Sequence, residues 1–206
     1  MNFLSLKIDR AVFAQAERDL AGIKNGITRA TVNAINATIT ATKKRMIKGL
    51  TDKLTLKSAY LKKRIYSNRF DARKGYSSIT LYGRNMSLSR FKSVDTRFKG
   101  RTRGIGVIVE EVKGMPRTIP GAFKAEAKTR RKNAAGKRVL VGVGADQVFK
   151  RRGEDRLPID ALKSLKLFDL FKVTGVKEDV ERFSSEELTR QFKNKVADQI
   201  TKYANR

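Results

Sequence analysis

The first quarter of the chain carries apolar residues at a helical spacing. From Ala11 to about Leu54 the sequence contains no proline, and apolar residues recur at alternating intervals of three and four. This spacing predicts one face of a long helix. Gly22 and Gly26 each cost roughly 1 kcal/mol in a helix interior relative to alanine, so we expect a kink or a close helix approach there. The stripe consists of Phe13, Ala16, Leu20, Ile23, Ile27, Ala30, Ala34, Ala37 and Ala41.

A second apolar stripe takes over toward the end of this helix. Its members are larger than alanine, so the buried face is expected to rotate and the helix to cross more than one partner surface. Thr55 is then predicted to be the N-cap of a short basic helix over 56–66. The second stripe consists of Ile35, Ile39, Met46 and Leu50.

After Tyr66 the apolar period changes to strict alternation, which predicts strands. The connections 99–104 and 128–136 are rich in charge and contain glycine, which is typical of exposed hairpin loops. The alternating segments are Ile79/Leu81, Ile105/Val107/Val109 and Val139/Val141/Val143.

The end of the chain predicts a closing amphipathic helix. The segment 184–187, Ser-Ser-Glu-Glu, matches a capping box. No apolar run approaches the length of a transmembrane helix, and the first residues lack the basic segment and apolar run of a signal peptide, so we expect neither. The apolar stripe of the closing helix is Leu188, Phe192, Val196, Ile200 and Tyr203.

Together these patterns predict an α+β protein. We expect a long N-terminal helix and a C-terminal amphipathic helix to pack on a small, mainly antiparallel β-sheet. We find no internal repeat and no long linker, so 1–206 is interpreted as one domain. Within it, 10–66 is the helical part, 77–152 the β part with basic loops, and 174–205 the C-terminal helix.

The composition adds a strong positive charge. The formal net charge is +27, with an isoelectric point near 10.7. Lys and Arg outnumber Asp and Glu by 17 to 5 in residues 1–83 and by 20 to 7 in 84–156, but only by 10 to 8 in 157–206. Such an imbalance favours a polyanionic neighbour. By composition alone this could be nucleic acid, an anionic membrane or the acidic face of a protein assembly, and nucleic acid or an acidic protein ring is favoured. A merely soluble basic face is the plainer interpretation.

The cations concentrate in one predicted loop. Six of them fall within the eleven residues 128–138 with no acid among them, so we expect this loop to face DNA or an acidic ring partner. No helix-turn-helix, zinc finger or RNA-recognition motif is evident, so any DNA contact should be generic and electrostatic. The candidate partner-facing residues are Lys128, Arg130, Arg131 and Lys132, with the flanking Lys137 and Arg138.

The sequence offers little for catalysis. Cysteine and histidine are absent, which removes the thiolate nucleophile, the Cys-based zinc site and the commonest general base. The strongest enzymatic candidate is Asp95 with Glu111 and Lys113: in a nuclease the two carboxylates could hold Mg²⁺ and the lysine could help activate a water. Its plainer interpretation is a solvated strand end. We therefore expect no enzyme, no metal site and no cofactor.

Two further motifs have plainer interpretations as well. Glu154 and Asp155 lie among arginines, so they are interpreted as local charge balance in a turn and not as an acid/base pair. The segment 141–144, Val-Gly-Val-Gly, resembles a phosphate-binding loop but lacks the following Gly-Lys-Ser/Thr, so a strand ending in a turn is expected.

Three segments together resemble the prophage minor tail protein Z family, also described as tail-completion proteins. They are Arg29–Asn36, Arg117–Phe123, and Val148–Arg151 followed by Arg156–Ile159. Their order and spacing fit the family over roughly residues 10–205. The chain departs from the family pattern by inserting Glu154-Asp155 and by a longer charged segment after Leu165.

The resemblance implies a structural virion protein at the head-proximal neck of a long-tailed bacteriophage tail, present in the host cytoplasm during assembly. It implies a homo-oligomeric ring, sixfold like the tail rings, beside the tail terminator, the tape measure and the head–tail connector, with genomic DNA passing through and no membrane contact. The alternatives are a generic basic DNA-binding protein of phage origin or a metal-dependent nuclease.

The family-like motifs have an architectural interpretation. Pro120 fixes φ, Gly121 permits a tight turn and Phe123 supplies an apolar anchor as a strand resumes. We expect the same structural role for the whole set, which is Ile119, Pro120, Gly121, Ala122, Phe123, Phe149, Arg151 and Pro158.

Overall fold

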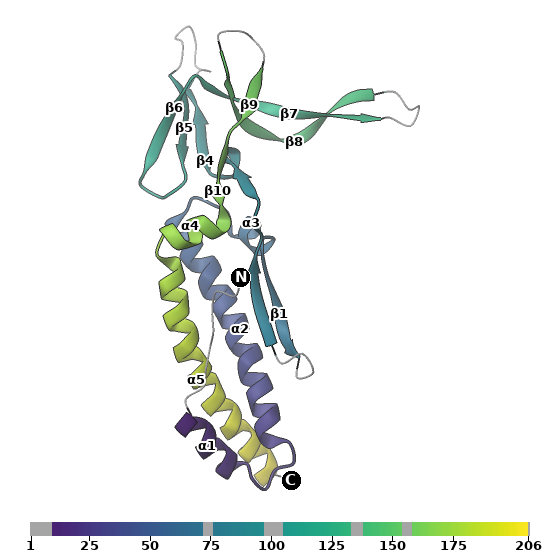
Figure 1. The fold of residues 1–206 in the computed structure, drawn as a ribbon, viewed down its shortest axis with the longest axis vertical. Coiled ribbons are helices and arrows are strands. Elements are labelled where there is room, and N and C mark those ends of the chain that lie inside the picture. Colours follow the sequence, from purple (N-terminus) through teal and green to yellow (C-terminus); the bar gives the residue numbers. More distant parts are fainter. Residues whose placement is uncertain (1–9, 72–75, 97–104, 133–137, 154–157, 206) are drawn as a thin grey trace. The chain divides into compact units, whose positions relative to one another are not determined.

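The computed structural model describes residues 10–71, 76–96, 105–132, 138–153 and 158–205 (Figure 1). It also leaves the side chains of residues 71, 127–132 and 138–145 undescribed. The described residues form an α+β protein with a helix near each end of the chain, as predicted. Its helices are α1 (Arg10–Asp19), α2 (Gly26–Lys53), α3 (Ser58–Lys62), the 3₁₀ turn η1 (Leu88–Arg90), α4 (Leu167–Val173) and α5 (Val176–Ala204).

The described strands pair antiparallel throughout, in four small sheets of order β1-β2, β10-β3, β4-β5-β6 and β7-β8-β9. The three predicted strands are present as β2, β5 and β8. The strands are β1 (Ile65–Asp71), β2 (Tyr76–Leu81), β3 (Asn85–Ser87), β4 (Lys92–Asp95), β5 (Gly106–Glu110), β6 (Pro116–Pro120), β7 (Ala122–Lys132), β8 (Arg138–Arg151), β9 (Ile159–Ala161) and β10 (Lys163–Lys166).

The chain divides into two compact units, each assembled from separate stretches of sequence. The helical unit comprises residues 1–49, 61–82 and 171–206, and the β unit comprises 50–60 and 83–170. The single predicted domain thus contains two groups of internal contacts. In the part of the chain that the structure describes, no helix is long and apolar enough to cross a membrane.

The helical unit is built on the pairing of α2 with α5. The two helices run antiparallel in Figure 1 and share a hydrogen bond from Thr42 to Ser184 and an ion pair from Arg45 to Asp179. On both helices the buried residues recur every four positions, so the i±4 rows form the contact. These rows are Ala30, Ala34, Thr38, Thr42 and Met46 on α2, and Val176, Val180, Ser184, Leu188, Phe192 and Val196 on α5.

The long N-terminal helix is divided into two, where the sequence predicted one helix with a kink. Residues 20–25 form turns between α1 and α2, and Asn25 adopts a left-handed φ of 58°. A Cβ on Gly26 would lie 3.0 Å from the Cβ of Ile23, so glycine is what lets the turn close onto α2. The apolar stripe nevertheless stays together, because Phe13, Ala16, Leu20, Ile23, Ile27, Ala30 and Ala34 join one core cluster with Phe192 and Val196.

Beyond Ala34 the buried face of α2 differs from the prediction. Thr38 and Thr42 are buried, whereas the predicted Ala37 and Ala41 are half-buried. Each threonine satisfies its hydroxyl: Thr38 Oγ1 donates to the carbonyl of Ala34, and Thr42 Oγ1 donates to Ser184 Oγ. A stripe chosen by hydrophobicity alone misses such positions, because burying a hydrogen-bonded hydroxyl costs little free energy.

The predicted capping box is wrong, because α5 begins at Val176 and residues 184–187 lie in its interior. Gly175, with φ 70°, occupies the N-cap position. The predicted apolar stripe is buried only as far as Val196, while Ile200 and Tyr203 are exposed. The predicted bounds of the helix, 174–205, still lie within two residues of the observed ones.

The predicted basic helix over 56–66 is mostly absent. Only the five residues of α3 are helical, and Ile65 already belongs to β1. Thr55 does not cap α3: its hydroxyl donates to the carbonyl of Glu110 and accepts the N–H of Lys92. Thr55 therefore ties the chain after α2 to the β4–β5 pair, a long-range role that local spacing cannot indicate.

Candidate nucleic-acid interface

The predicted basic loop is largely a β-ribbon. Lys128, Arg130, Arg131 and Lys132 lie in β7 and Arg138 begins β8, while Lys137 lies outside the described residues. The backbones of these strands pair continuously from Lys128↔Gly142 to Lys132↔Arg138. The prediction of a loop over 128–132 is therefore wrong. The Val139/Val141/Val143 alternation was identified correctly as a strand, but its partner strand was hidden by the density of charge.

The family-like motif residues come together at one corner of the β unit. The segment 119–123 turns the chain from β6 into β7, with Gly121 at φ 71°. The rings of Phe123 and Phe149 lie 5.8 Å apart, and the Arg151 guanidinium lies 5.9 Å from the centre of the Phe123 ring. Ala122 is fully buried.

Two backbone contacts close the same corner. A Cβ on Gly106 would meet the carbonyl oxygen of Ile119 at 2.1 Å, so only glycine fits opposite Pro120 in the β5–β6 pair. The carbonyl of Pro158 accepts the N–H of Arg152 at 3.2 Å. The arrangement is what an architectural motif requires.

The candidate nuclease residues do not meet. Asp95 pairs with Val107 at one end of the β4–β5 ladder, whereas Glu111 follows the other end, four residues or roughly 13 Å farther along the chain. Each carboxylate also has a structural partner: Asp95 Oδ2 accepts the N–H of Lys124, and Glu111 Oε2 lies 2.6 Å from Arg117 Nη2. Among the described residues no group of three or more acidic side chains could hold a metal ion.

Glu110 is the acid in this region whose environment is most specific. The N–H of Gly114 donates to its Oε1 at 2.8 Å, and Lys92 Nζ lies 2.9 Å from its Oε2. These contacts, the Gly114 hydrogen bond foremost, lower the pKa of Glu110, so it stays ionised. A carboxylate held in this way stabilises a turn and is poorly suited to act as a general base.

Glu154 and Asp155 lie outside the described residues, and 141–144 is strand within β8.

The β1–β2 hairpin presents an exposed surface of tyrosines and polar side chains, which the sequence patterns did not reveal. The N–H of Tyr82 donates to the carbonyl of Arg64, which extends the ladder in which Tyr66 pairs with Thr80 and Asn68 with Ser78. Because side chains alternate across a strand, these residues share one side of the hairpin. We call it the tyrosine face, and it consists of Arg64, Tyr66, Asn68, Ser78, Thr80 and Tyr82.

The opposite side of the hairpin is the buried one. Ile65 is fully buried, and Ser67, Ile79 and Leu81 are half-buried. The hairpin is fastened to α2 by the N–H of Phe70, which donates to Asn36 Oδ1 at 2.8 Å. The sequence predicts a strand at Ile79 and Leu81 but not its partner strand, because Ile65 continues the apparent helical period of 56–66.

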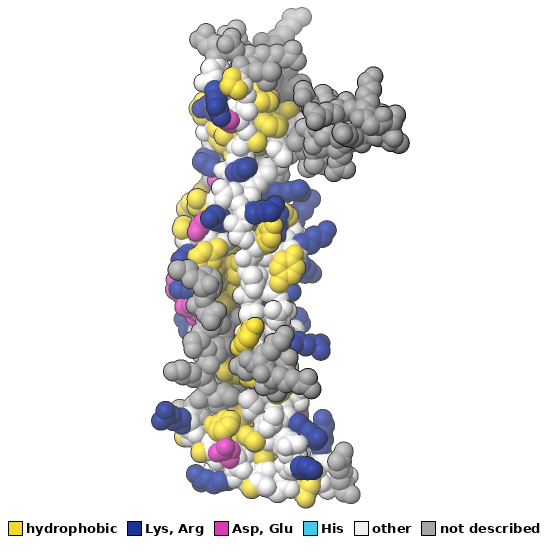
Figure 2. Space-filling model, turned by 45° about the vertical axis from the view of Figure 1, so that its right-hand side comes forward, with side chains coloured by type: hydrophobic (Ala, Val, Ile, Leu, Met, Phe, Trp, Pro, Cys, Tyr) yellow, Lys and Arg dark blue, Asp and Glu magenta, His cyan; other side chains and the backbone are white. Residues whose placement is uncertain are grey.

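The tyrosine face is aromatic and cationic. Tyr66 is 54% exposed and Tyr82 37% exposed. The Arg64 guanidinium lies 4.7 Å from the centre of the Tyr82 ring, within the range of a cation–π contact. Lys62 and Lys63 precede Arg64 and are exposed, and among the described residues neither has an ion-pair partner. Figure 2 brings this side of the helical unit forward, where yellow side chains are bordered by dark blue Lys and Arg.

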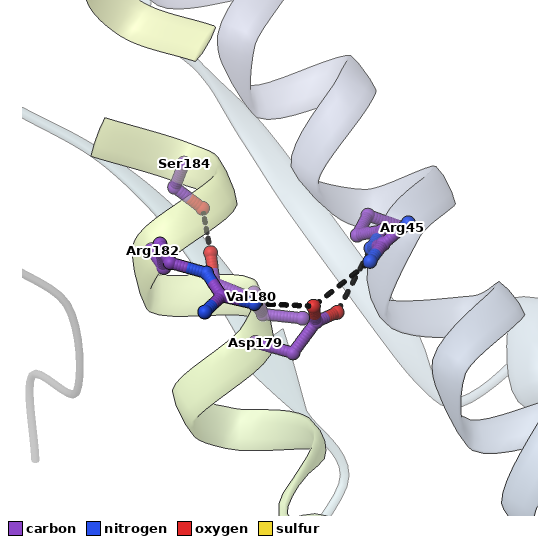
Figure 3. A network of polar contacts seen from close by, with 5 residues as sticks. All are labelled: Arg45, Asp179, Val180, Arg182 and Ser184. Atoms are coloured by element: carbon purple, nitrogen blue, oxygen red, sulfur yellow. Dashed lines mark hydrogen bonds and ion pairs between the residues drawn. The ribbon is translucent and has the colours of Figure 1, made fainter. Parts of the chain in front are cut away.

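Charge is divided unevenly between the paired helices. Residues 20–70 contain twelve Lys and Arg but one acid, Asp52, whereas α5 contains six of each sign. The contact between the helices uses one of these acids, since Arg45 binds both carboxylate oxygens of Asp179 at 2.8 Å (Figure 3). The remaining acids of α5 pair mostly within the helix, as in Lys177–Glu181, Arg190–Glu187 and Lys195–Asp198. The α2 and hairpin segments therefore keep a positive excess.

Comparison with known proteins gives no match: no family model, no curated protein and no solved structure matches this chain.

Proposed function

We propose that the protein is a structural, non-enzymatic component of a long-tailed bacteriophage tail, a tail-completion protein at the head-proximal neck. The first support for the proposal is that two of the family-like motifs lie together in the structure. Two segments that are separated by about thirty residues, around Phe123 and around Phe149–Pro158, form one corner of the β unit. The corner serves the fold, so the function is assigned to the assembly and not to a reactive group.

The charge supports a polyanionic or acidic neighbour. A net charge of +27 on 206 residues causes strong electrostatic repulsion within the protein. Several copies in a ring would repel one another as well, unless anions lie close by. Genomic DNA passing through the neck, or an acidic ring of a neighbouring protein, supplies them. The partners proposed are the tail terminator, the tape measure and the head–tail connector, with the protein itself in a ring that is sixfold like the tail rings.

The test of this assignment is electron cryo-microscopy of the necks of purified virions, with immunolabelling to identify the chain. We expect several copies in a ring at the head-proximal end of the tail. Virions that lack the protein, or that carry a single copy, would contradict the proposal. We expect the purified protein to show no cleavage of DNA with Mg²⁺ or Mn²⁺, and a metal-dependent cleavage that Glu111→Ala abolishes would favour the nuclease alternative.

A second candidate is a generic DNA-binding protein of phage origin. The tyrosine face favours it, because exposed rings among cations suit contact with nucleic acid. Such a protein would bind DNA as a free chain, with affinity that falls steeply as salt rises, and would be absent from purified tails.

A further inference from the structure

We propose that the tyrosine face is a binding surface for single-stranded nucleic acid, on which bases stack against Tyr66 and Tyr82 while Lys62, Lys63 and Arg64 neutralise phosphates. The inference concerns one surface of the helical unit and stands whether or not the protein belongs to a phage tail. Two aromatic rings are exposed on a hairpin whose other side is buried.

The rings are arranged as neighbours. Tyr66 is paired with Thr80, and Tyr82 lies two residues beyond Thr80 on the same side, so the two tyrosines are diagonal partners. Diagonal partners in an antiparallel pair have Cα atoms about 7–8 Å apart, within reach of each other's side chains. Bases of a strand laid across the hairpin could therefore meet both rings.

Arg64 holds one of these rings in place. Its guanidinium lies 4.7 Å from the centre of the Tyr82 ring, and its backbone carbonyl accepts the N–H of Tyr82 at 2.8 Å. A ring oriented before binding loses little freedom when a base stacks on it. The same guanidinium is a cation next to the stacking site, where a phosphate of the bound strand would lie.

The surrounding chemistry favours nucleic acid over a protein partner. The other members of the face, Asn68, Ser78 and Thr80, are hydrogen-bonding residues that can meet base edges or phosphates. Tyr and Arg are common in protein interfaces too, so what distinguishes this face is its charge: it contains Arg64 and no acid. Twelve cations against one acid in residues 20–70 supply the electrostatic attraction that a phosphodiester backbone requires.

A single strand is favoured over a duplex because stacking needs the face of a base. In duplex DNA these faces are covered by neighbouring base pairs, so a duplex offers the tyrosines only its backbone. Removing an aromatic ring on which a base stacks lowers the affinity by roughly 5- to 150-fold. The role of the tyrosines is therefore measurable separately from charge.

The test uses the full chain and fluorescence anisotropy with a labelled oligothymidylate, the same strand annealed to oligoadenylate, and unlabelled heparin as a competitor without bases. We expect the single strand to bind more tightly than the duplex. Tyr66→Ala and Tyr82→Ala should each weaken single-strand binding roughly tenfold. Tyr203→Ala, which removes a tyrosine that is 59% exposed on α5, is the matched control and should leave binding unchanged.

Two further measurements separate stacking from charge and from misfolding. Lys62→Gln with Lys63→Gln should reduce the slope of log affinity against log salt, whereas Tyr66→Ala should leave that slope unchanged. The chain has five tyrosines and no tryptophan, so quenching of tyrosine emission by the single strand reports stacking directly. If circular dichroism shows that Tyr66→Ala is unfolded, Tyr66→Leu retains apolar bulk without a planar ring and should show the same loss of affinity.

Several results would overturn the proposal. One is equal binding by Tyr66→Ala, Tyr82→Ala and Tyr203→Ala, and another is a duplex or heparin that binds as tightly as the single strand with no dependence on the tyrosines. Failure of both oligonucleotides to bind, including the case in which an acidic protein binds this face instead, would overturn it as well.

Discussion

Thr42 and Ser184 bring two hydroxyl groups together in the contact between α2 and α5. Thr42 and Ser184 are 1% and 0% exposed. Thr42 Oγ1 donates to Ser184 Oγ at 3.1 Å, and Ser184 Oγ donates in turn to the carbonyl of Val180 at 2.5 Å (Figure 3 shows the second bond). Both hydroxyl donors therefore have acceptors, so these small side chains bring the helices close without leaving either hydroxyl unpaired.

Removing the Ser184 hydroxyl alone should cost more than removing both hydroxyls of this pair. Ser184→Ala leaves the Thr42 hydroxyl buried without its acceptor, which we expect to cost about 1–3 kcal/mol of unfolding free energy. Adding Thr42→Val should recover much of that loss, because no polar group then remains to be satisfied. Urea denaturation of both single variants and the double variant measures this coupling. Simple additivity of the two single effects would contradict the role given to the pair.

The ion pair between Arg45 and Asp179 makes part of the stability dependent on pH. Hydrogen bonds from Arg45, with a weaker charge contribution from Arg182, lower the pKa of Asp179. A depressed carboxylate pKa stabilises the folded state above the unfolded value of about 3.9, and that contribution is lost as the pH falls through the folded pKa. Because both side chains are partly exposed, we expect a modest effect.

Asp179→Asn should therefore lower the unfolding free energy at pH 7 by about 1 kcal/mol. The gap between wild type and variant should narrow steadily as the pH falls below about 4. Denaturant titrations across this range test it. Asp198→Asn is the matched control, since its partner Lys195 lies on the same helix and the pair ties no two elements together. A gap that does not change with pH would mean that the carboxylate charge is not what stabilises the contact.

Helix pairing depends on how closely α2 approaches α5 at Gly49. A Cβ at this position would lie 2.9 Å from Cγ1 of Val176, closer than real Cβ contacts allow. A Cβ at Gly22, in the turn between α1 and α2, would have no atom within 4 Å, and Gly22 does not have a positive φ. The two glycines thus differ: the missing side chain of Gly49 permits close contact between α2 and α5, whereas a side chain at Gly22 would meet no neighbouring atom.

Gly49→Ala should destabilise the protein by about 1–2 kcal/mol in spite of the better helix propensity of alanine, because overpacking outweighs it. Val176→Ala in the same chain should relieve the clash and recover part of the loss. Gly22→Ala, the matched control, should be neutral or slightly stabilising. Thermal unfolding followed by circular dichroism compares the three. An equal effect at Gly22 and Gly49 would show that close helix approach is not the cause.

The secondary structure was predictable where one period dominated a segment. The strands β2, β5 and β8 and the bounds of α5 follow from alternation and from an apolar stripe. β1 was missed because Ile65 also fits the helical spacing of Leu61, and β7 because its residues are cationic. β1 and β7 are the hairpin partners of β2 and β8, which were found, so their structure is decided by pairing and not by their own composition.

For the molecule as a whole, the dense cations of β7 and β8 remain the segment proposed to face DNA or an acidic neighbour. Arg130, Arg131 and Lys132 pair by backbone with Leu140, Val139 and Arg138, so they belong to a two-stranded ribbon, since β9 pairs only with residues 149–151 of β8. A ribbon can present charge to an extended anion along its length.

Replacing Arg130, Arg131 and Lys132 by Glu should leave folding nearly unchanged and block the formation of infectious particles, because the charge toward the anionic neighbour is reversed. Complementation of a phage that lacks the gene, scored as titre, measures this. Reversal of Lys193 and Lys202 on the charge-balanced α5 is the control and should be tolerated. Wild-type titre from the triple variant would show that the ribbon is only a solvated hairpin.

The sequence alone established the α+β class, the strong positive charge, the absence of histidine and cysteine chemistry and the two terminal helical stripes, because composition and local period carry that information. Tertiary structure decided which hydroxyls are buried, that Asp95 and Glu111 lie apart, and that the tyrosine face exists. These features depend on contacts between residues far apart in the chain, for which no local pattern encodes the partner.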